Sequence, residues 1–444
     1  MPKFRSVVRT RNGRPLYYGW WIVLSGSISQ GYTSGTFWNG FGAFFDPIVE
    51  QFGWSRAVTS GSQSLQRTES GMIAPFVGLF IDKFGPKKVM LGGTLVTGAG
   101  FILLSQVQSL WQFYAAFALI SVGLSFGTFL VVTTTVTNWF VQMRGRALAF
   151  TFAGSALGGV LVPVVVWIIT ISDWRTALII VGVGYWMVGI PVAFVMRSRP
   201  EDYGYLPDGR LDERNQDDSI RPGENHATSR DKSTLQVPND TNVEINYTTK
   251  EALKTRTFWQ LSFSMGISQL LMSASIHHMP AISSFGFTRE TAGLVILGVS
   301  VFSLIGRLST GVLGDYLDKR RLIALAFACQ FAGTLIFAFS SSYIHLAGFI
   351  VIWGFGFGAS IPARFALIAD YFGRRHYGSI MGTMMTVSTI FGVIGPVLVG
   401  FIFDMRGNYQ EPFVLMSMTV LFAIPLMLTL EQPVKSRPSV SIGL

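Results

Sequence analysis

Two stretches of this chain repeat each other at a distance of 233 residues. The segment FGWSR at 52–56 recurs as FGFTR at 285–289, and the pattern G-x-x-x-D at 78–82 recurs at 311–315. Repetition over so long a period indicates two copies of one structural unit. In an apolar chain, two such copies are expected to surround a shared centre.

The composition indicates a protein that crosses a membrane many times. Half of the 444 residues are hydrophobic, only 13% are charged, and the mean hydropathy is +0.44. The range 89–143 contains 55 residues without one Asp, Glu, Lys or Arg. Two helices of about 20 residues, each crossing a hydrocarbon layer about 30 Å thick, fit into it.

The apolar runs predict twelve spans, six in each half, in an all-α membrane protein of two pseudo-symmetric six-helix bundles. The predicted spans are 19–45, 57–81, 89–106, 111–138, 147–171, 176–196, 258–285, 291–314, 322–340, 345–369, 379–403 and 412–430. The predicted domains are an N-terminal tail (1–18), a first bundle (19–196), a linker (197–257), a second bundle (258–430) and a C-terminal tail (431–444).

Charge predicts the orientation of these spans. With both termini in the cytoplasm, 27 of the 34 Lys and Arg residues lie on the inside, as the positive-inside rule requires. The net charge of +10 therefore indicates contact with anionic lipid in short loops and argues against nucleic acid as a partner. The linker is too polar to form a core and is expected to be largely disordered, with a possible capping box at Thr248-x-x-Glu251 before the second bundle.

Several classes of chemistry find no support in the sequence. Cys329 is the only cysteine, so neither a disulfide nor a cysteine metal cluster is expected. The chain has no phosphate-binding loop, and no H-E-x-x-H or G-x-S-x-G motif stands at the end of a span. We therefore expect no enzyme, no catalytic residues, no metal and no cofactor.

The repeated G-x-x-x-D pattern lies between predicted spans in each half. Each copy places a carboxylate at a cytoplasmic helix end beside several cations and a tight turn. Such a loop can hold helices together in one conformation and release them in another. The residues assigned to this conformational switch are Gly78, Asp82, Lys83, Gly85, Lys87, Gly311 and Asp315.

This signature resembles that of the major facilitator superfamily, and the resemblance covers all twelve spans. The sequence from Trp139-Phe140 to Ser155 resembles the fifth helix of the branch that contains monocarboxylate transporters and the oxalate:formate antiporter. The sequence from Asp370 to Asp404 resembles the tenth and eleventh helices of that branch. The resemblance implies a small carboxylate substrate, moved by proton symport or by anion exchange.

Charges within the spans are candidates for function because a lone charge in hydrocarbon costs at least about 3 kcal/mol. Arg307 lies eight residues before Asp315, hence about 12 Å from the inner boundary. The resemblance implies that it is the partner of the substrate carboxylate, which a guanidinium fork can grip with two hydrogen bonds. The alternative is a structural arginine whose guanidinium extends to the inner membrane–water interface. Arg364 is a second candidate anion anchor, with a structural role as its alternative.

Span two contains two further charges near the midplane, Arg67 and Glu69. Two residues apart, they point to different faces of a helix and do not pair with each other. Arg67 is expected to help hold an anion or to pair with an acid across the interface between the halves. Glu69 is the candidate for a carried proton, with the role of a fixed counter-ion as the alternative.

Uncharged polar residues complete the predicted substrate site. His277 and His278 on span seven are candidates for the cavity, although single histidines in helices are commonly only packed. Thr133 is a candidate hydroxyl contact, although threonine often bonds its own backbone. In the resemblance, Asn39 stands where mammalian monocarboxylate transporters have a lysine, and Ser303 stands where they have an aspartate. These replacements put the proton route of that branch in doubt.

We therefore predict a secondary transporter of a small organic anion, most favourably a monocarboxylate, working by alternating access. One alternative is an exporter of amphipathic compounds, although three cations against one acid in the spans argue against it. Another alternative is a nutrient sensor that does not transport. The sequence leaves open which carboxylate is bound, whether a proton or a counter-anion is coupled, and the direction of flux.

Overall fold

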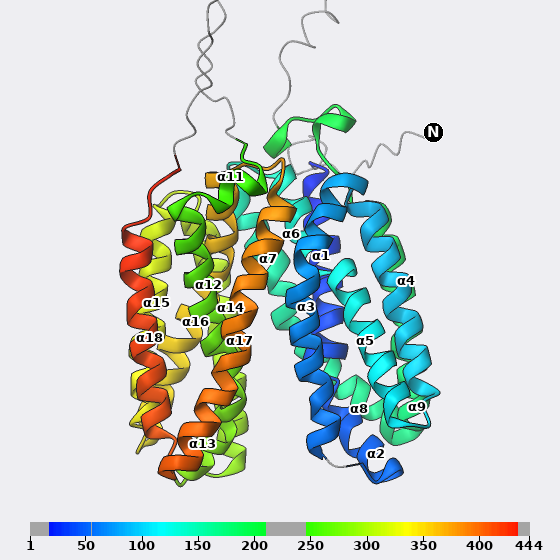
Figure 1. Ribbon diagram of the computed structural model, residues 1–444, viewed down its shortest axis with the longest axis vertical. Helices are drawn as coiled ribbons and strands as arrows, with labels where there is room; N and C mark the ends of the chain where they lie inside the picture. The colour runs from blue at the N-terminus through cyan, green and yellow to red at the C-terminus, as the bar shows by residue number, and fades with distance from the viewer. Residues whose placement is uncertain (1–16, 55, 210–245, 434–444) are drawn as a thin grey trace, which may run out of the picture.

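The computed structural model describes residues 17–54, 56–209 and 246–433, and every regular element in these ranges is helical. Figure 1 shows two groups of helices side by side, α1 to α9 in one and α12 to α18 in the other. The described parts of the linker and the beginning of α1 lie at one end of the molecule. We call this the linker end and the opposite end the far end.

The N-terminal bundle contains nine helical elements and two short irregular turns. They are α1 (Gly19–Thr33), η1 (Ser34–Trp38), α2 (Gly42–Phe52), α3 (Arg56–Phe84), α4 (Pro86–Ser105), α5 (Leu110–Gly127), α6 (Phe129–Trp139), α7 (Arg144–Leu157), η2 (Gly158–Leu161), α8 (Val162–Ile171) and α9 (Trp174–Val195).

The C-terminal bundle follows the linker. It contains α12 (Arg256–Ala274), η5 (Ser275–His277), α13 (His278–Ser284), α14 (Arg289–Leu313), α15 (Lys319–Ala338), α16 (Tyr343–Phe372), α17 (Tyr377–Arg406) and α18 (Gln410–Leu428). The described linker residues form η3 (Glu201–Tyr203), η4 (Pro207–Gly209) and α11 (Thr249–Leu253).

Several predicted spans are interrupted helices. The first span is α1, the π-helical turn η1 and the start of α2, and the seventh is α12, the 3-10 turn η5 and α13. The fifth span breaks at the 3-10 turn η2. In the described residues, nine continuous helical stretches are long and apolar enough to cross a bilayer. The first span of each half is therefore broken, and such irregular turns often lie at functional positions.

Glycines set the contact between α1 and α7, the helices that carry two of these turns. A Cβ on Gly31 would lie 3.0 Å from the carbonyl oxygen of Gly154, and one on Gly35 would collide with the backbone of Gly158. Close backbone approach through small residues is a common way for helices to associate in lipid. The two irregular turns η1 and η2 are consequently brought side by side.

The buried apolar side chains form two clusters. The larger runs through the C-terminal bundle and across the linker end into the N-terminal one, where it includes Val77, Val136 and Phe152. The smaller, around Phe37 and Phe117, belongs to the N-terminal bundle alone. The bundles thus share a core at the linker end.

The linker differs in part from the disordered segment that its composition predicts. Residues 198–209 and 246–255 pack against the bundles, while 210–245 lie outside the described residues. The predicted capping box is confirmed, because the Thr248 hydroxyl accepts the Glu251 N–H and the Glu251 carboxylate accepts the Thr248 N–H.

Candidate functional site

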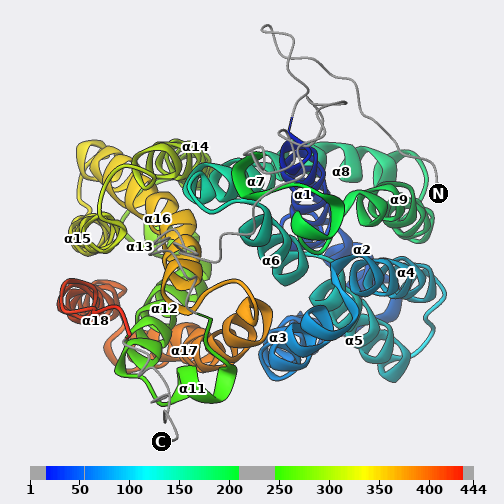
Figure 2. The same cartoon turned by 90° about the horizontal axis from the view of Figure 1, so that it is seen from above.

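The two bundles meet mainly through two pairs of helices, α3 with α17 and α7 with α14, as Figure 2 shows from the linker end. Glycine lies at each contact. A Cβ on Gly78 would collide with the backbone of Gly378, and a Cβ on Gly311 would collide with the side chain of Ala149. Glycines of the repeated G-x-x-x-D pattern therefore let each helix approach the opposite bundle closely.

The aspartates of the same pattern also reach into the opposite bundle. Asp82 accepts the backbone N–H of Ser379 at 3.2 Å, and it accepts the Ser379 hydroxyl as well. Ser379 lies in the first turn of α17. A carboxylate at this position satisfies a free N–H and interacts favourably with the positive end of the helix dipole.

Asp315 makes the equivalent contact in the other half. It accepts the N–H of Gly145 at 3.0 Å in the first turn of α7, and its Oδ2 lies 3.0 Å from Arg146 Nε in an ion pair. Burial raises the pKa of Asp315, while the Gly145 N–H and the Arg146 charge act in the opposite direction. The two copies of the pattern therefore each cap a helix across the interface.

The remaining switch candidates stay within their own half. Gly85 has φ of +81°, so it forms the turn between α3 and α4 that a residue with a Cβ would strain. The Lys87 ammonium lies 4.2 Å from the centroid of the Phe194 ring, and the Lys83 ammonium lies 5.3 Å from that of Phe84. A switching role for these lysines stays a prediction.

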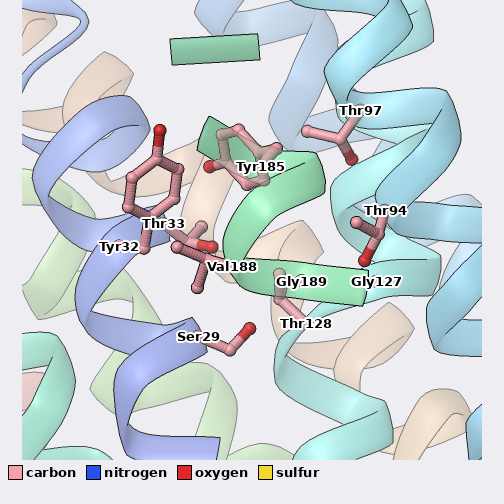
Figure 3. A pocket seen from close by; sticks show the side chains of 10 residues that line it. All are labelled: Ser29, Tyr32, Thr33, Thr94, Thr97, Gly127, Thr128, Tyr185, Val188 and Gly189. Carbon is pink, nitrogen blue, oxygen red and sulfur yellow. The ribbon is translucent and has the colours of Figure 1, made fainter. Parts of the chain in front are cut away.

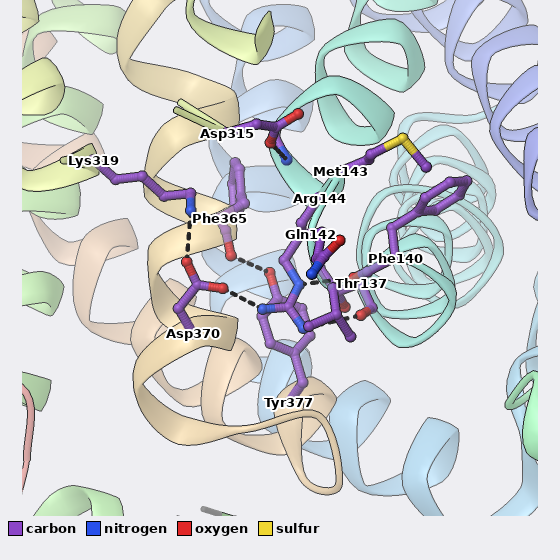
Figure 4. Close-up of polar contacts among 12 residues, drawn as sticks. Thr137, Phe140, Gln142, Met143, Arg144, Asp315, Lys319, Phe365, Asp370 and Tyr377 are labelled. Carbon is purple, nitrogen blue, oxygen red and sulfur yellow. Dashed lines mark hydrogen bonds and ion pairs between the residues drawn. The ribbon is translucent and has the colours of Figure 1, made fainter. Parts of the chain in front are cut away.

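A charged cluster near the start of α7 joins the bundles as well (Figure 4). Arg144, which is 2% exposed, forms an ion pair with Asp370 of α16, and the Lys319 ammonium lies 2.8 Å from the other Asp370 oxygen. Arg144 also donates to the Phe140 carbonyl at 3.0 Å. Arg144 could not be singled out from the sequence, because a basic residue in a short loop is ordinary. Asp370 belonged to the family resemblance but received no role.

The helix faces that meet at the linker end are uncovered toward the far end. A residue eleven positions further along a helix lies three turns away on nearly the same face. Two pairs of this kind, each with the exposed fraction of the second member, are Arg307 and Ile296 (41%), and Thr386 and Val397 (66%). The interface is closed at the linker end and opens toward the far end.

Arg307 lies at this interface, where closed and open regions meet. Its Nη1 donates to the Phe152 carbonyl and to the Ser155 hydroxyl of α7, both at 2.9 Å. Its Nε is buried and has no hydrogen-bond partner in the described part of the chain. Among the described residues no carboxylate lies within ion-pair distance of it. The guanidinium therefore retains an uncompensated charge and a free donor.

A chain of hydrogen bonds connects Arg307 with Asn39. The Asn39 amide donates to the Ser34 hydroxyl at 2.9 Å, and that hydroxyl donates to the Ser155 carbonyl at 2.6 Å. The Ser155 hydroxyl in turn accepts from Arg307. The structure thus connects two predicted site residues through Ser34, in η1, and Ser155, just before η2. We call Asn39, Ser34, Ser155 and Arg307 the polar chain.

An aromatic cluster closes the interface beside the polar chain. The rings of Phe129, Phe152 and Phe365 belong to α6, α7 and α16, and their centroids lie 5.3 to 5.5 Å apart. Phe365 therefore packs on two rings of the opposite bundle. This apolar contact joins the two bundles beside Arg307.

Arg364 has a different environment from Arg307. It is 7% exposed, its Nε donates to the Ser360 carbonyl of its own helix at 3.1 Å, and its guanidinium lies 5.9 Å from the centroid of the Phe327 ring. These contacts all belong to the C-terminal bundle. A role for Arg364 as a second anion anchor stays a prediction.

The two predicted histidines are packed within the C-terminal bundle. His278 is 7% exposed and is enclosed by the rings of Phe337, Phe349, Trp353 and Phe413, with centroids 4.9 to 5.5 Å away. His277 Nε2 lies 3.1 Å from the carbonyl oxygen of Pro396 on α17. Neither histidine joins the polar chain, and these surroundings fit packing better than ligand contact.

The other predicted residues also lie apart from the polar chain. The Thr133 hydroxyl donates to the Phe129 carbonyl of its own helix at 2.6 Å. Gly71 faces α17, so Glu69, two residues earlier, lies about 200° away around α3. Glu69 Oε2 is buried without a hydrogen-bond partner among the described residues. The Arg67 side chain lies outside the described residues.

A small hollow lined by hydroxyl groups lies inside the N-terminal bundle (Figure 3). Its lining includes Tyr32, Thr33, Thr94, Thr97 and Tyr185, from α1, α4 and α9. None of the predicted site residues lines it. It is therefore separate from the interface that carries the polar chain.

Known proteins with similar sequences are transporters. Monocarboxylate transporter 13 of Rattus norvegicus is 22% identical over 419 residues, covering 93% of this chain and 89% of the relative. The oxalate:formate antiporter of Oxalobacter formigenes is 25% identical over 371 residues, covering 80% of this chain and 79% of the relative. Both lie in the branch that the sequence motifs resemble.

A solved structure and a family model agree with these relatives. The crystal structure of the human organic anion transporter MFSD10 (TETRAN) matches with a TM-score of 0.65 at 14% identity, covering 92% of this chain and 98% of that one. The family model of the major facilitator superfamily matches residues 30–342 and 261–443. The predicted family and the predicted all-helical fold of two bundles are thereby confirmed. This integral, multi-pass membrane protein belongs to the major facilitator superfamily of transporters.

Proposed function

We propose that this transporter carries a small organic anion, most favourably a monocarboxylate, with Arg307 as its anchor. The observation that carries the proposal is the state of that guanidinium, which lies between the bundles with a free buried donor and only neutral acceptors around it. A carboxylate would supply the missing charge and accept from the guanidinium fork. The names of the two relatives support the same substrate class.

The transport cycle would be alternating access, with the linker end in the cytoplasm. The sequence supports this orientation, because 27 of the 34 Lys and Arg residues fall in segments predicted to be inside when both termini are cytoplasmic. In this orientation the described conformation is closed to the cytoplasm and open to the outside. Opening the linker end would break the contacts of Asp82, Asp315 and Asp370 between the bundles. A bound anion competes with the Phe152 carbonyl and the Ser155 hydroxyl for Arg307, which loosens one further contact.

Exchange of one anion for another fits these residues better than proton symport. The polar chain contains no carboxylate. Asn39 and Ser303 stand where the related proton route has a lysine and an aspartate. Glu69 lies on the side of α3 away from α17. A counter-anion on Arg307 would instead compensate the charge during the return step.

Transport by the purified chain in proteoliposomes tests this proposal. Uptake of labelled formate, lactate, pyruvate or oxalate is expected when the vesicles contain unlabelled anion, and a proton gradient alone is expected to have little effect. Uptake driven by the gradient without internal anion would contradict exchange. Movement of a lipophilic cation but of none of these anions would contradict the substrate class.

Arg307→Gln is expected to lower uptake at least about tenfold, because a charge-assisted hydrogen bond contributes roughly 1.5–3 kcal/mol. Arg406→Gln is the matched control, since it removes the same charge from an exposed residue that pairs with Glu411 at the far end. Equal uptake by both variants would exclude Arg307 as the anchor.

A further inference from the structure

The first part of the linker forms a strap across the cytoplasmic loop between α6 and α7. We define the strap as residues 200–208. The Asp208 carboxylate accepts three consecutive backbone N–H groups, from Val141, Gln142 and Met143, at 2.8 to 3.2 Å. Asp208 itself has φ of +61°, a conformation that aspartate tolerates better than most residues. These bonds fix one end of the strap to the N-terminal bundle.

Aromatic contacts hold the rest of the strap on the same bundle. The rings of Tyr203 and Tyr205 lie 6.5 and 6.0 Å from that of Trp139, between centroids. The Arg197 guanidinium lies 4.5 Å from the centroid of the Tyr203 ring. The Tyr17 hydroxyl donates to the Leu206 carbonyl at 3.3 Å. The strap is therefore a packed part of the N-terminal bundle.

One side chain of the strap reaches the other bundle. The Glu201 carboxylate lies 3.0 Å from Arg374, which belongs to the turn between α16 and α17. Arg374 also donates to the Asn138 carbonyl at the end of α6, at 2.7 Å. The side chains of Glu201 and Arg374 are 40% and 16% exposed, so the ion pair is partly shielded from solvent. The strap thus links an anchored segment of one half to a turn of the other.

We propose that the strap is a latch that holds the linker end closed. Glu201 can grip Arg374 only while the ends of α6 and α16 are close together, and separation of the bundles at the linker end breaks this bond. Asp208 acts indirectly, because its bonds to the α6–α7 loop hold Glu201 in place. The latch is independent of the substrate, so it applies to any solute that this protein carries.

Distances between spin labels on the full-length protein in lipid nanodiscs test the latch. Lys88 and Arg321 are exposed at the linker end of opposite bundles, so Lys88→Cys and Arg321→Cys in a Cys329→Ser background provide the label sites. Glu201→Gln is compared with Asp202→Asn. Asp202 is the neighbouring exposed acid and makes no hydrogen bond or ion pair in the described residues, so it is the matched control.

Glu201→Gln is expected to raise the population with the longer distance roughly two- to fivefold over the control, the range for a partly exposed ion pair. Asp208→Ala is expected to raise this population by a similar factor. The variant with both Glu201→Gln and Asp208→Ala should show an effect only slightly larger than that of the stronger single variant. Equal distance distributions for Glu201→Gln and Asp202→Asn would overturn the proposal, and so would fully additive effects of the two latch variants.

Discussion

Replacement of Asp370 with asparagine tests the ion pair between Arg144 and Asp370, which joins the two bundles. The Arg144 side chain is only 3% exposed, and its hydrogen bonds to Phe140 and Thr137 lie within its own bundle. Asp370→Asn leaves this buried guanidinium without its anionic partner. The same contact is lost when the linker end opens, so the substitution should destabilise the closed conformation specifically.

The size of the effect follows from the exposure of the two partners. Removing one member of a fully buried ion pair costs about 3–5 kcal/mol, whereas an exposed pair contributes about 0–1 kcal/mol. Asp370 is 28% exposed and also contacts Lys319, so an intermediate value of about 2 kcal/mol is expected. This corresponds to roughly a thirtyfold shift toward the open linker end.

Spin labels at positions 88 and 321, on opposite bundles, can report this shift. Lys319→Gln is the comparison, and we expect a smaller effect because the Lys319 side chain is 18% exposed and Arg144 keeps its partner. Arg144→Gln combined with Asp370→Asn should cost less than the sum of the two single changes. Unchanged distances in Asp370→Asn, or strict additivity in the double variant, would refute the reasoning.

Three further predictions concern helix packing, helix capping and the role of His278. Gly35→Val should lower the free energy of unfolding in detergent by about 1–3 kcal/mol, because its side chain would collide with Gly158. Gly42→Ala should have little effect, because the space around its Cβ is open. Asp173→Ala should lower stability by about 1 kcal/mol and leave transport unchanged, because Asp173 accepts the N–H of the third residue of α9. His278→Phe should preserve both transport and melting temperature; loss of transport at unchanged stability would instead support the predicted ligand role.

The spans could be located from the sequence because each must be apolar over its own length. The interruptions at η1 and η2 could not be located from the sequence. They lie where Gly35 and Gly158 bring two backbones together, and that contact joins segments more than a hundred residues apart. Glycine occurs throughout the chain, so its presence alone does not show which glycines face each other.

The candidate site was predictable in part for a similar reason. The helical rise predicts the depth of Arg307 and its distance from the lipid headgroups. It does not predict which helix of the other half faces Arg307. Ser155 lay within the motif that indicated the family, yet its bond to Arg307 depends on the crossing of α7 and α14. The packing of His278 could not be predicted, because its aromatic neighbours come from α15, α16 and α18.

The sequence alone determined the number of halves, the approximate limits of their spans and the charges that lie between or within them. These are local properties, since hydrocarbon selects apolar residues one span at a time. Only the tertiary structure decided which surfaces meet. Asp82 caps a helix 297 residues away and Asp315 caps one 170 residues away, and these pairings arise from the packing of whole bundles against each other.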